Sequence, residues 1–548
     1  MRRRTTWRTI TTILTLIAVL PVVSFGGLTA APRAWTPGDP FILQGTIVTP
    51  QTIVRHGYVL IENGRISAVS SKRLDRNGAL VINTEGTIYP GLVDLHNHVP
   101  WNVVPRWSPP RLYSNRFEWR IDPDYQQKVA IPFNDLIAGG RVCDMNTYGE
   151  MRALAGGATS ILATHRVSCI RGLVRNLDYN SGFYGTTQLN LEHIISAIEV
   201  PPASDLVARA QFVAGARSAI ASSFYEALFL HLSEGVDAVS LEEFDFIRSS
   251  GLLNPKGACI HCTSLDPDRY QAMAAAGTSL VWSPRSNVEL YGRTADIGAA
   301  LDVGVRIALA PDWAITGSSN ILDELRFADR WNAEHLGGRL SDEQLVAMVT
   351  STPAAMAGID DEVGSIRPGL RADLLVIPDD DDDPYRQLLQ AGPQEVRLVL
   401  IGGMPVYGDA GAMLAFWDAA QLEPIDIGGT TMALASPAVA FRLADVVSRL
   451  EPALQAEGIS LAPLTEPPPS VCGDAACSGS ESCLDCPADC GVCACASEAE
   501  CQPASCCNPT GCITIWEPQS CGSPTCGNGC TICLQSCACQ QGACVAIF

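Results

Sequence analysis

The stretch TIYPGLVDLHNH, residues 87–98, decides the fold of this chain. Residues 87–95 are mostly apolar and predict a buried β-strand that ends in His96-Asn97-His98. Because alternate side chains of a strand point to the same face, His96 and His98 are expected to project side by side from its end. Two imidazoles in that arrangement suit one transition-metal ion.

Three further apolar runs also end in residues that can bind a metal or carry a proton. The runs are residues 226–230, 258–260 and 306–311, and the polar residues that follow them are His231 with Glu234, His261, and Asp312. Helical segments at 266–276 and 321–336 lie between and after the runs, and alternating strands and helices indicate a parallel sheet. Functional residues at the carboxyl ends of several strands are typical of a (β/α)₈ barrel.

As an ordered set, these motifs resemble the metal-dependent amidohydrolases, most closely the branch that contains cytosine deaminase, guanine deaminase and the triazine hydrolases. The resemblance covers roughly residues 38–410 and implies His-x-His on the first barrel strand, His-x-x-Glu on the fifth, histidine on the sixth and aspartate on the eighth. Residues 283–287, SPRSN, resemble the seventh-strand motif. Many members carry histidine and cysteine before that proline, whereas this chain has Trp282 and Ser283, a difference that bears on the substrate.

The predicted ligands of one divalent metal are His96, His98, His231 and Asp312. Neutral imidazoles and a carboxylate suit Zn²⁺, with Fe²⁺ as the alternative, and the bound ion would lower the pKa of a water ligand toward about 7. Glu234 is expected to pass a proton to a leaving nitrogen. His261 would orient the water or polarise the substrate, and the resemblance implies that Asp312 also accepts the water proton.

The lysines favour one metal over two. Two-metal members of the wider family bridge their ions with a carboxylated lysine on the fourth strand. The predicted barrel contains only Lys128 and Lys256, and neither falls at that place.

Three residues are predicted to contact the substrate: Trp101, Arg285 and Asn287. Aromatic residues in a long loop also serve in packing, and asparagine after a strand also serves as a turn or cap residue, so these alternatives stay open.

The remaining sequence divides into flanking units. Residues 1–31 predict a signal peptide, because arginines precede an apolar stretch and small residues follow it, with an uncleaved anchor as the alternative. Short alternating strands predict a small β-sandwich built from both sides of the barrel sequence. The predicted units are 38–90 and 358–410 for the sandwich, 91–357 for the barrel, 411–465 for a helical extension, 466–470 for a proline-rich linker and 471–548 for a cysteine-rich module.

The tail holds 18 of the 22 cysteines, between Cys472 and Cys544. In an exported chain this density predicts a disulfide framework, with zinc at Cys-x-x-Cys pairs such as Cys530 and Cys533 as the alternative. The segment resembles cysteine-rich repeats appended to exported myxobacterial proteins. It is a candidate for surface attachment, partner binding or protease resistance.

The net charge of −21 argues against nucleic acid and against membrane contact beyond the signal or anchor. We therefore predict an exported hydrolase with one metal and a small-molecule substrate, which acts on a non-peptide carbon–nitrogen bond. It would deaminate an amino-heterocycle or open a cyclic amide. A dipeptidase-like amide hydrolase and a catalytically idle surface-binding protein are the alternatives. The sequence predicts no oligomeric state.

Overall fold

The computed structural model describes residues 35–74, 79–162, 173–177, 194–439 and 441–466, together with the backbone of short strands in the tail. The predicted signal peptide, most of the linker and most of the cysteine-rich module lie outside these residues. The four tail strands, β18 Gln502–Ser505, β19 Asn508–Ile513, β20 Ser536–Gln540 and β21 Ala543–Ile547, pair as two antiparallel hairpins. Among the described residues no helix has the length and apolar character that a membrane span requires.

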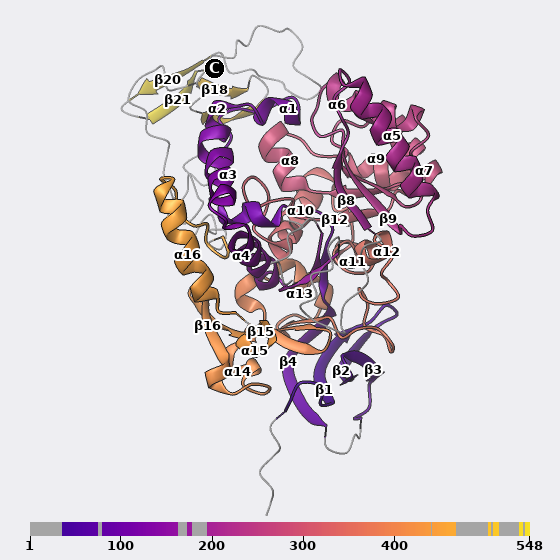
Figure 1. The fold of residues 1–548 in the computed structure, drawn as a ribbon, viewed down its shortest axis with the longest axis vertical. Helices are drawn as coiled ribbons and strands as arrows, with labels where there is room; N and C mark the ends of the chain where they lie inside the picture. Colours follow the sequence, from indigo (N-terminus) through magenta and orange to yellow (C-terminus); the bar gives the residue numbers. More distant parts are fainter. Residues whose placement is uncertain are drawn as a thin grey trace, which may run out of the picture.

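In the described middle part of the chain, eight strands follow one another in the order predicted for the barrel. They are β5 Leu92–Asp94, β6 Ala158–Ile161, β7 Arg175–Asn176, β8 Ile194–Glu199, β9 Ala227–Leu232, β10 Gly257–His261, β11 Ser279–Trp282 and β12 Ile307–Leu309. Three of them, β8, β9 and β12, are labelled in Figure 1. Strands β5–β7 and strands β8–β12 pair in parallel. A parallel bridge between Asn97 and Asp312 joins the carboxyl ends of the first and the last strand.

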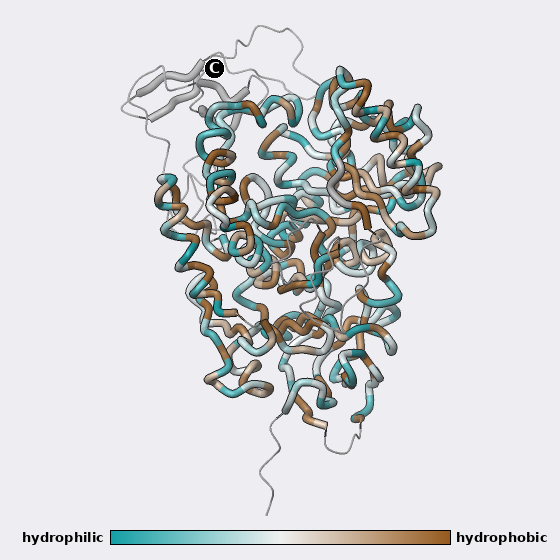
Figure 2. Tube along the Cα trace, in the orientation of Figure 1, coloured by the Kyte–Doolittle hydropathy of each residue, from teal (hydrophilic) through white to brown (hydrophobic). Residues whose placement is uncertain are grey.

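Helices follow most of these strands, and acidic or amide residues mark where they begin. Asp237, Asp266 and Asn320 each accept a backbone N–H of the helix that they precede, which satisfies a donor that has no partner within the helix. The helices between β8 and the end of the barrel are α5 Leu206–Ala221, α6 Ala238–Ser249, α7 Pro267–Ala276, α8 Pro284–Tyr291, α9 Ile297–Asp302, α10 Ile321–His335, α11 Asp342–Ala347 and α12 Ser351–Met356. Hydrophobic residues are common along the strands, whereas the outer helices carry many polar residues (Figure 2).

Strands from both sides of the barrel sequence form one further sheet, as predicted. Its order is β16-β17-β15-β14-β13-β4-β1-β2-β3. The bounds are β1 Phe41–Val48, β2 Ile53–Glu62, β3 Arg65–Ser70, β4 Leu80–Pro90, β13 Leu374–Pro378, β14 Leu398–Ile401, β15 Met404–Asp409, β16 Leu422–Ile427 and β17 Thr430–Ala435. Asn63 and Gly64 form the turn that connects β2 and β3, with positive φ at both residues. The nine strands are hydrogen-bonded into one continuous sheet.

Residues 411–465 are not the purely helical extension that the sequence predicted. Strands β16 and β17 extend the sheet, because buried and exposed residues alternate along β16 with the period of a strand. The expected amphipathic helix is interrupted after α15 Ser436–Val439 and resumes as α16 Leu443–Ala456. Glu423 of β16 accepts the backbone N–H groups of Leu443 and Ala444 and so caps α16.

The stretch that decides the fold is divided between two sheets. Strand β4 ends at Pro90 and belongs to the nine-stranded sheet, whereas β5 begins at Leu92 and belongs to the barrel. Gly91 lies at the crossing, where its N–H donates to Asp373 O over 2.8 Å. A Cβ there would lie 2.3 Å from the side chain of Thr159, so only glycine fits. The single strand predicted over residues 87–95 is therefore wrong in its continuity.

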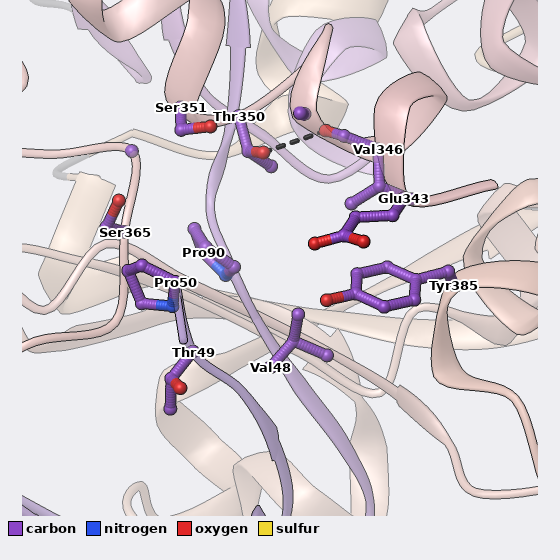
Figure 3. A pocket seen from close by; sticks show the side chains of 12 residues that line it. Val48, Thr49, Pro50, Pro90, Glu343, Val346, Thr350, Ser351, Ser365 and Tyr385 are labelled. Atoms are coloured by element: carbon purple, nitrogen blue, oxygen red, sulfur yellow. Dashed lines mark hydrogen bonds between the residues drawn. The ribbon is translucent and has the colours of Figure 1, made fainter. Parts of the chain in front are cut away.

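A pocket of about 140 Å³ lies between the nine-stranded sheet and the helices after β12 (Figure 3). Val48 and Pro90 line it on one side, and Glu343 and Tyr385 line it on the other. Pro90 precedes β5, whereas His96 follows that strand, so the pocket lies at the opposite strand end from the predicted metal ligands. In a (β/α)₈ barrel the amino ends of the strands serve stability rather than catalysis.

The buried carboxyl group of Glu150, in α4 Val142–Ala155, makes the stability of the barrel depend on pH. Glu150 accepts backbone N–H groups of Leu173 and Val174 and the side chains of Asn146 and Asn176. Burial outweighs these hydrogen bonds and raises the pKa of Glu150 from 4.5 to about 7. The folded state therefore keeps a proton that the unfolded chain releases at lower pH.

We expect the free energy of unfolding to fall more steeply between about pH 5 and pH 8 in the wild type than in Glu150→Gln, by up to about 3 kcal/mol. The contribution of a raised pKa is complete below the unfolded pKa and is lost as pH rises through the folded pKa, here about 7. Urea unfolding of both proteins across this range measures the difference. Parallel pH profiles would contradict the assignment to Glu150.

Candidate metal centre

The structure brings the predicted residues together at the carboxyl ends of the barrel strands. His96 and His98 follow β5, His231 lies in β9, His261 ends β10, and Asp312 follows β12. Two overlapping sets of possible metal ligands result, one of His96, His98 and His231 and one of His96, His261 and Asp312. Residues far apart in the sequence therefore share one site.

The distances between donor atoms fit a single ion. His96 Nε2 lies 3.1 Å from His231 Nε2 and 3.2 Å from Asp312 Oδ1, and His98 Nε2 lies 3.3 Å from Asp312 Oδ1. Ligand atoms at about 2.0–2.1 Å from a tetrahedral Zn²⁺ would be separated by about 3.3 Å. Imidazole nitrogens and a carboxylate oxygen at these distances can all face one cation, so the donor set fits a divalent metal.

Burial keeps two of these imidazoles neutral. The pKa values of His96 and His231 are both lowered well below the usual 6.5, first by burial and then by the neighbouring imidazoles. A neutral imidazole offers a lone pair, whereas a protonated one cannot bind a metal. His96 and His231 can thus each offer a lone pair to a cation at neutral pH.

Ser283 fixes the orientation of His96. The Nδ1 atom of His96 lies 2.9 Å from Ser283 Oγ, which leaves Nε2 to face the other ligands. Ser283 stands where many members of the resembling family carry cysteine. From the sequence, this difference was expected to bear on the substrate. In the structure, Ser283 contacts His96, which is a predicted metal ligand.

A chain of hydrogen bonds determines the tautomer of His261. The indole of Trp282 can only donate, and it donates to Thr294 Oγ1 over 2.8 Å. The Thr294 hydroxyl then donates to Asn287 Oδ1, which turns Asn287 Nδ2 toward His261 Nδ1 at 2.8 Å. Because Nδ1 accepts, the proton of neutral His261 is on Nε2, and a protonated nitrogen cannot be a ligand. His261 therefore presents Nε2 as a hydrogen-bond donor, and Asn287 contacts its other ring nitrogen. Contact of Asn287 with a substrate stays a prediction.

Glu234 faces His261 across the site. Its Oε2 lies 3.7 Å from His261 Nε2, and its Oε1 accepts the hydroxyl of Tyr291 over 2.7 Å. Just before it, Ser233 has φ of 55° and donates its backbone N–H to Glu243 over 2.9 Å. His261 and Asp312 also have positive φ, of 72° and 68°. Non-glycine residues rarely adopt this conformation, and those that do are often found at functional sites.

A cluster of aromatic side chains lies next to His98, one of the predicted ligands. Trp313 follows Asp312, and its ring centroid lies 5.8 Å from that of His98. Trp119 and Tyr125 lie 5.4 Å and 6.3 Å from Trp313. Trp101, predicted to contact substrate, lies 5.9 Å from Trp313 and stacks on another ring at 3.5 Å. Its contact with a substrate stays a prediction.

Arg285 has a protein partner. Its Nη1 lies 2.8 Å from Glu466 Oε2, at the start of the predicted linker, and Arg106 Nη1 lies 3.3 Å from the other oxygen of Glu466. Its guanidinium is thus held by the end of the described chain. Contact of Arg285 with a substrate also stays a prediction.

The barrel lysines lie where the sequence placed them. Lys256 Nζ donates to the backbone oxygens of Ser222 and Tyr225, and Lys128 pairs with Asp124 at the surface. Neither supplies a carboxylated bridge between two ions. The geometry therefore fits one metal.

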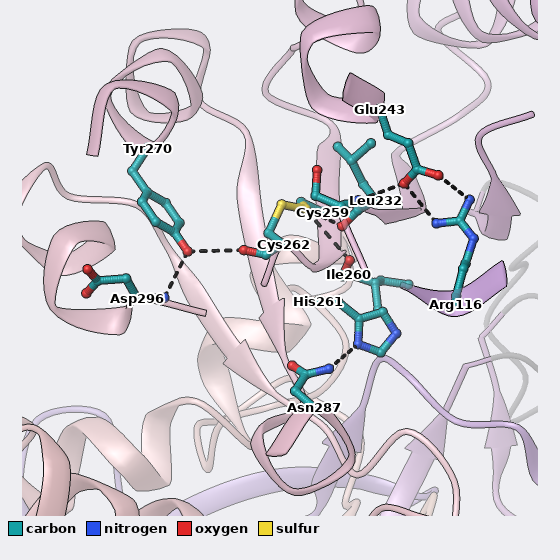
Figure 4. The surroundings of a disulfide bond; sticks show 11 residues. Arg116, Leu232, Glu243, Cys259, Ile260, His261, Cys262, Tyr270, Asn287 and Asp296 are labelled. Carbon is teal, nitrogen blue, oxygen red and sulfur yellow. Dashed lines mark hydrogen bonds and ion pairs between the residues drawn. A yellow bond between two sulfur atoms is a disulfide. The ribbon is translucent and has the colours of Figure 1, made fainter. Parts of the chain in front are cut away.

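Two cysteines flank His261 and are joined by a disulfide (Figure 4). Cys259 lies in β10 and Cys262 follows His261, and both are fully buried. Cys262 O accepts the hydroxyl of Tyr270 over 3.2 Å. Cys143 is also disulfide-bonded. The sequence alone gave no prediction of this bond between Cys259 and Cys262.

Comparisons with known proteins agree with the prediction of a hydrolase. Residues 231–406 match a sequence model of the amidohydrolase family. A 5-methylthioadenosine/S-adenosylhomocysteine deaminase from Caldicellulosiruptor saccharolyticus is 25% identical over 423 residues, which cover 71% of this chain and 97% of that protein. A 5′-deoxyadenosine deaminase from Methanosarcina mazei is 22% identical over 402 residues, which cover 66% and 90%.

Solved structures share the fold. An adenosine deaminase from Xanthomonas campestris with bound zinc has a TM-score of 0.54 at 17% identity, over 76% of this chain and 98% of that one. A mutant atrazine chlorohydrolase from Arthrobacter aurescens, complexed with zinc and atraton, has a TM-score of 0.55 at 16% identity, over 76% and 100%. Residues 231–406 therefore match the amidohydrolase family, and the prediction of a hydrolase that acts on a non-peptide carbon–nitrogen bond is confirmed.

Proposed function

We propose that this protein is an exported hydrolase with one zinc ion that removes the amino group from an amino-substituted heterocycle. The observation that carries the proposal is the convergence of His96, His98, His231 and Asp312 around one point, with Glu234 and His261 beside it. Opening of a cyclic amide uses the same groups and stays the second reaction to test.

The side chains divide the work of the reaction. The ion would supply a nucleophilic water at neutral pH. Glu234 removes a proton as the water oxygen bonds to the ring carbon, and it delivers a proton to the amino nitrogen as the carbon–nitrogen bond breaks and ammonia leaves. His261 donates its Nε2–H to the atom of the ring or water that gains negative charge.

The surroundings of the site support a planar substrate. Trp313 lies beside His98, and Trp119 and Tyr125 pack against Trp313. Aromatic side chains can stack on flat heterocycles. The relatives named above are deaminases of adenine-containing compounds. These similarities support an amino-heterocycle as the substrate.

Export is supported by the cysteines of the described barrel. Disulfides persist in oxidising compartments, and Cys259, Cys262 and Cys143 are all disulfide-bonded. The proposal adds that residues 1–31 direct export and that the tail forms a disulfide framework with a surface partner.

Ammonia release by the purified full-length protein tests the function. The panel would contain adenosine-type nucleosides, guanine, cytosine, amino-triazines and lactams, with metal content measured on the same samples. Ammonia release with about one zinc per chain supports the proposal. Release of amino acids from dipeptides would favour the dipeptidase alternative, and a metal-loaded protein without turnover on the whole panel would favour an idle barrel.

A further inference from the structure

Glu234, the residue expected to move the proton, has one carboxylate oxygen already occupied. Tyr291, the last residue of α8, donates its hydroxyl to Glu234 Oε1 over 2.7 Å. The other oxygen, Oε2, faces His261 Nε2 at 3.7 Å. The two oxygens of this carboxylate are therefore not equivalent.

Trp119 determines the direction of the Tyr291 hydrogen bond. Its indole Nε1–H, from α1 Arg116–Trp119, donates to the Tyr291 hydroxyl oxygen over 2.8 Å. Because an indole can only donate, Tyr291 accepts on that side and its single proton points to Glu234. Burial and the neighbouring Glu234 charge raise the pKa of Tyr291 well above 10, so the hydroxyl keeps its proton.

The three side chains have little freedom to rearrange. Trp119, Tyr291 and Glu234 expose 5%, 4% and 4% of their surface. Trp119 also packs against Tyr125 with ring centroids 5.0 Å apart and against Trp313 at 5.4 Å. A buried network in which each donor has an acceptor holds its members in one arrangement.

We propose that Trp119 and Tyr291 are positioning residues that hold Glu234 Oε1, so that Oε2 alone exchanges protons with water and substrate. This inference rests on the proposed function. His261 contributes to this arrangement, because its Nε2 faces Glu234 Oε2. Its other ring nitrogen is held by a chain of hydrogen bonds through Trp282, Thr294 and Asn287. Glu234 and His261 are thus each held by a chain of hydrogen bonds that begins at a tryptophan.

Replacing Tyr291 with phenylalanine tests the proposal. In the zinc-loaded protein we expect kcat to fall by about 10- to 100-fold while KM changes less than about two-fold, because a hydrogen bond to a charged group is lost from the proton carrier and not from substrate binding. Metal content should stay the same. Tyr148→Phe is the matched control, because Tyr148 is equally buried and also donates one hydrogen bond, to Ala462 O.

Combined variants separate positioning from a general effect on the fold. In a Glu234→Gln background, Tyr291→Phe should cause no further loss of kcat, because Tyr291 acts through Glu234. Trp119→Phe should lower kcat about two- to five-fold alone and add nothing to Tyr291→Phe. Additive losses, or an equal loss in Tyr148→Phe, would overturn the proposal.

An infrared difference spectrum keeps this inference separate from the proposed function. The carboxylate bands of Glu234 are assigned by their disappearance in Glu234→Gln and require no substrate. We expect these bands to shift in Tyr291→Phe. Unshifted bands would overturn the inference even in an active deaminase, whereas shifted bands in a protein that releases no ammonia would reject the proposed function and retain only the hydrogen bond between Tyr291 and Glu234.

Discussion

The variant His96→Ala should be purified with less than about a tenth of the metal of the wild type, and its turnover should fall by at least about 100-fold. The Nε2 atom of His96 lies within 3.2 Å of donor atoms of both His231 and Asp312, so it is central to the ligand set. Changes to residues that only support a ligand already cost about 10- to 100-fold in metal affinity or activity. Elemental analysis and kcat measured on the same preparations give both numbers.

An exposed histidine provides the control for this result. His335 lies at the end of α10 with half of its side chain exposed, and His335→Ala should keep both metal and turnover. Circular dichroism of His96→Ala would show whether the barrel is still folded. Retention of one metal per chain in folded His96→Ala would remove His96 from the ligand set, and two metals per wild-type chain would contradict a single-metal site.

The variant Glu234→Gln should keep its metal but lose turnover by about 100-fold or more. Glutamine preserves the shape of the side chain and can still accept the Tyr291 hydroxyl, but it cannot take a proton from water and return it to a leaving nitrogen. Steady-state kinetics with the substrate found in the ammonia screen, together with metal analysis, measure the effect. Unchanged turnover would exclude Glu234 as the proton carrier.

Glu423→Gln is a suitable companion to this variant. Glu423 is as buried as Glu234, but it caps α16 at the edge of the nine-stranded sheet. We expect it to affect stability and leave kcat unchanged. A similar loss of turnover in both variants would mean that glutamine at any buried glutamate disturbs the fold.

The ligands could be predicted because each follows an apolar run. Of the predicted ligands, His231 lies in β9, His96 and His98 follow β5, and Asp312 follows β12, and the carboxyl ends of the strands of a barrel meet at one face. Hydrophobic periodicity and the type of the next polar residue are local properties, so the sequence displays them. The same reasoning joined residues 87–95 into one strand, because periodicity does not show that Gly91 passes close to Thr159.

The residues behind the ligands could not be predicted in this way. Thr294 and Tyr291 have common residue types and no strand-end position that marks them. Ser283 follows β11, but serine is not a residue type that predicts a contact with a histidine. Their roles depend on which atom of a neighbour they meet, and the neighbours are as many as 187 residues away in the chain. Buried and exposed residues alternate along β16, as in a strand, but the helical pattern of the residues that follow favoured a helix for the whole segment.

The sequence by itself predicted the barrel, the metal ligands and the proton carrier, because strand periodicity and ligand chemistry are properties of nearby residues. Only the tertiary structure showed that Asn287 contacts His261, that Tyr291 donates to Glu234, and that the flanking strands form a single sheet. The direction of a hydrogen bond is fixed by the partner at each end. Partners that are distant in the chain meet only when it folds.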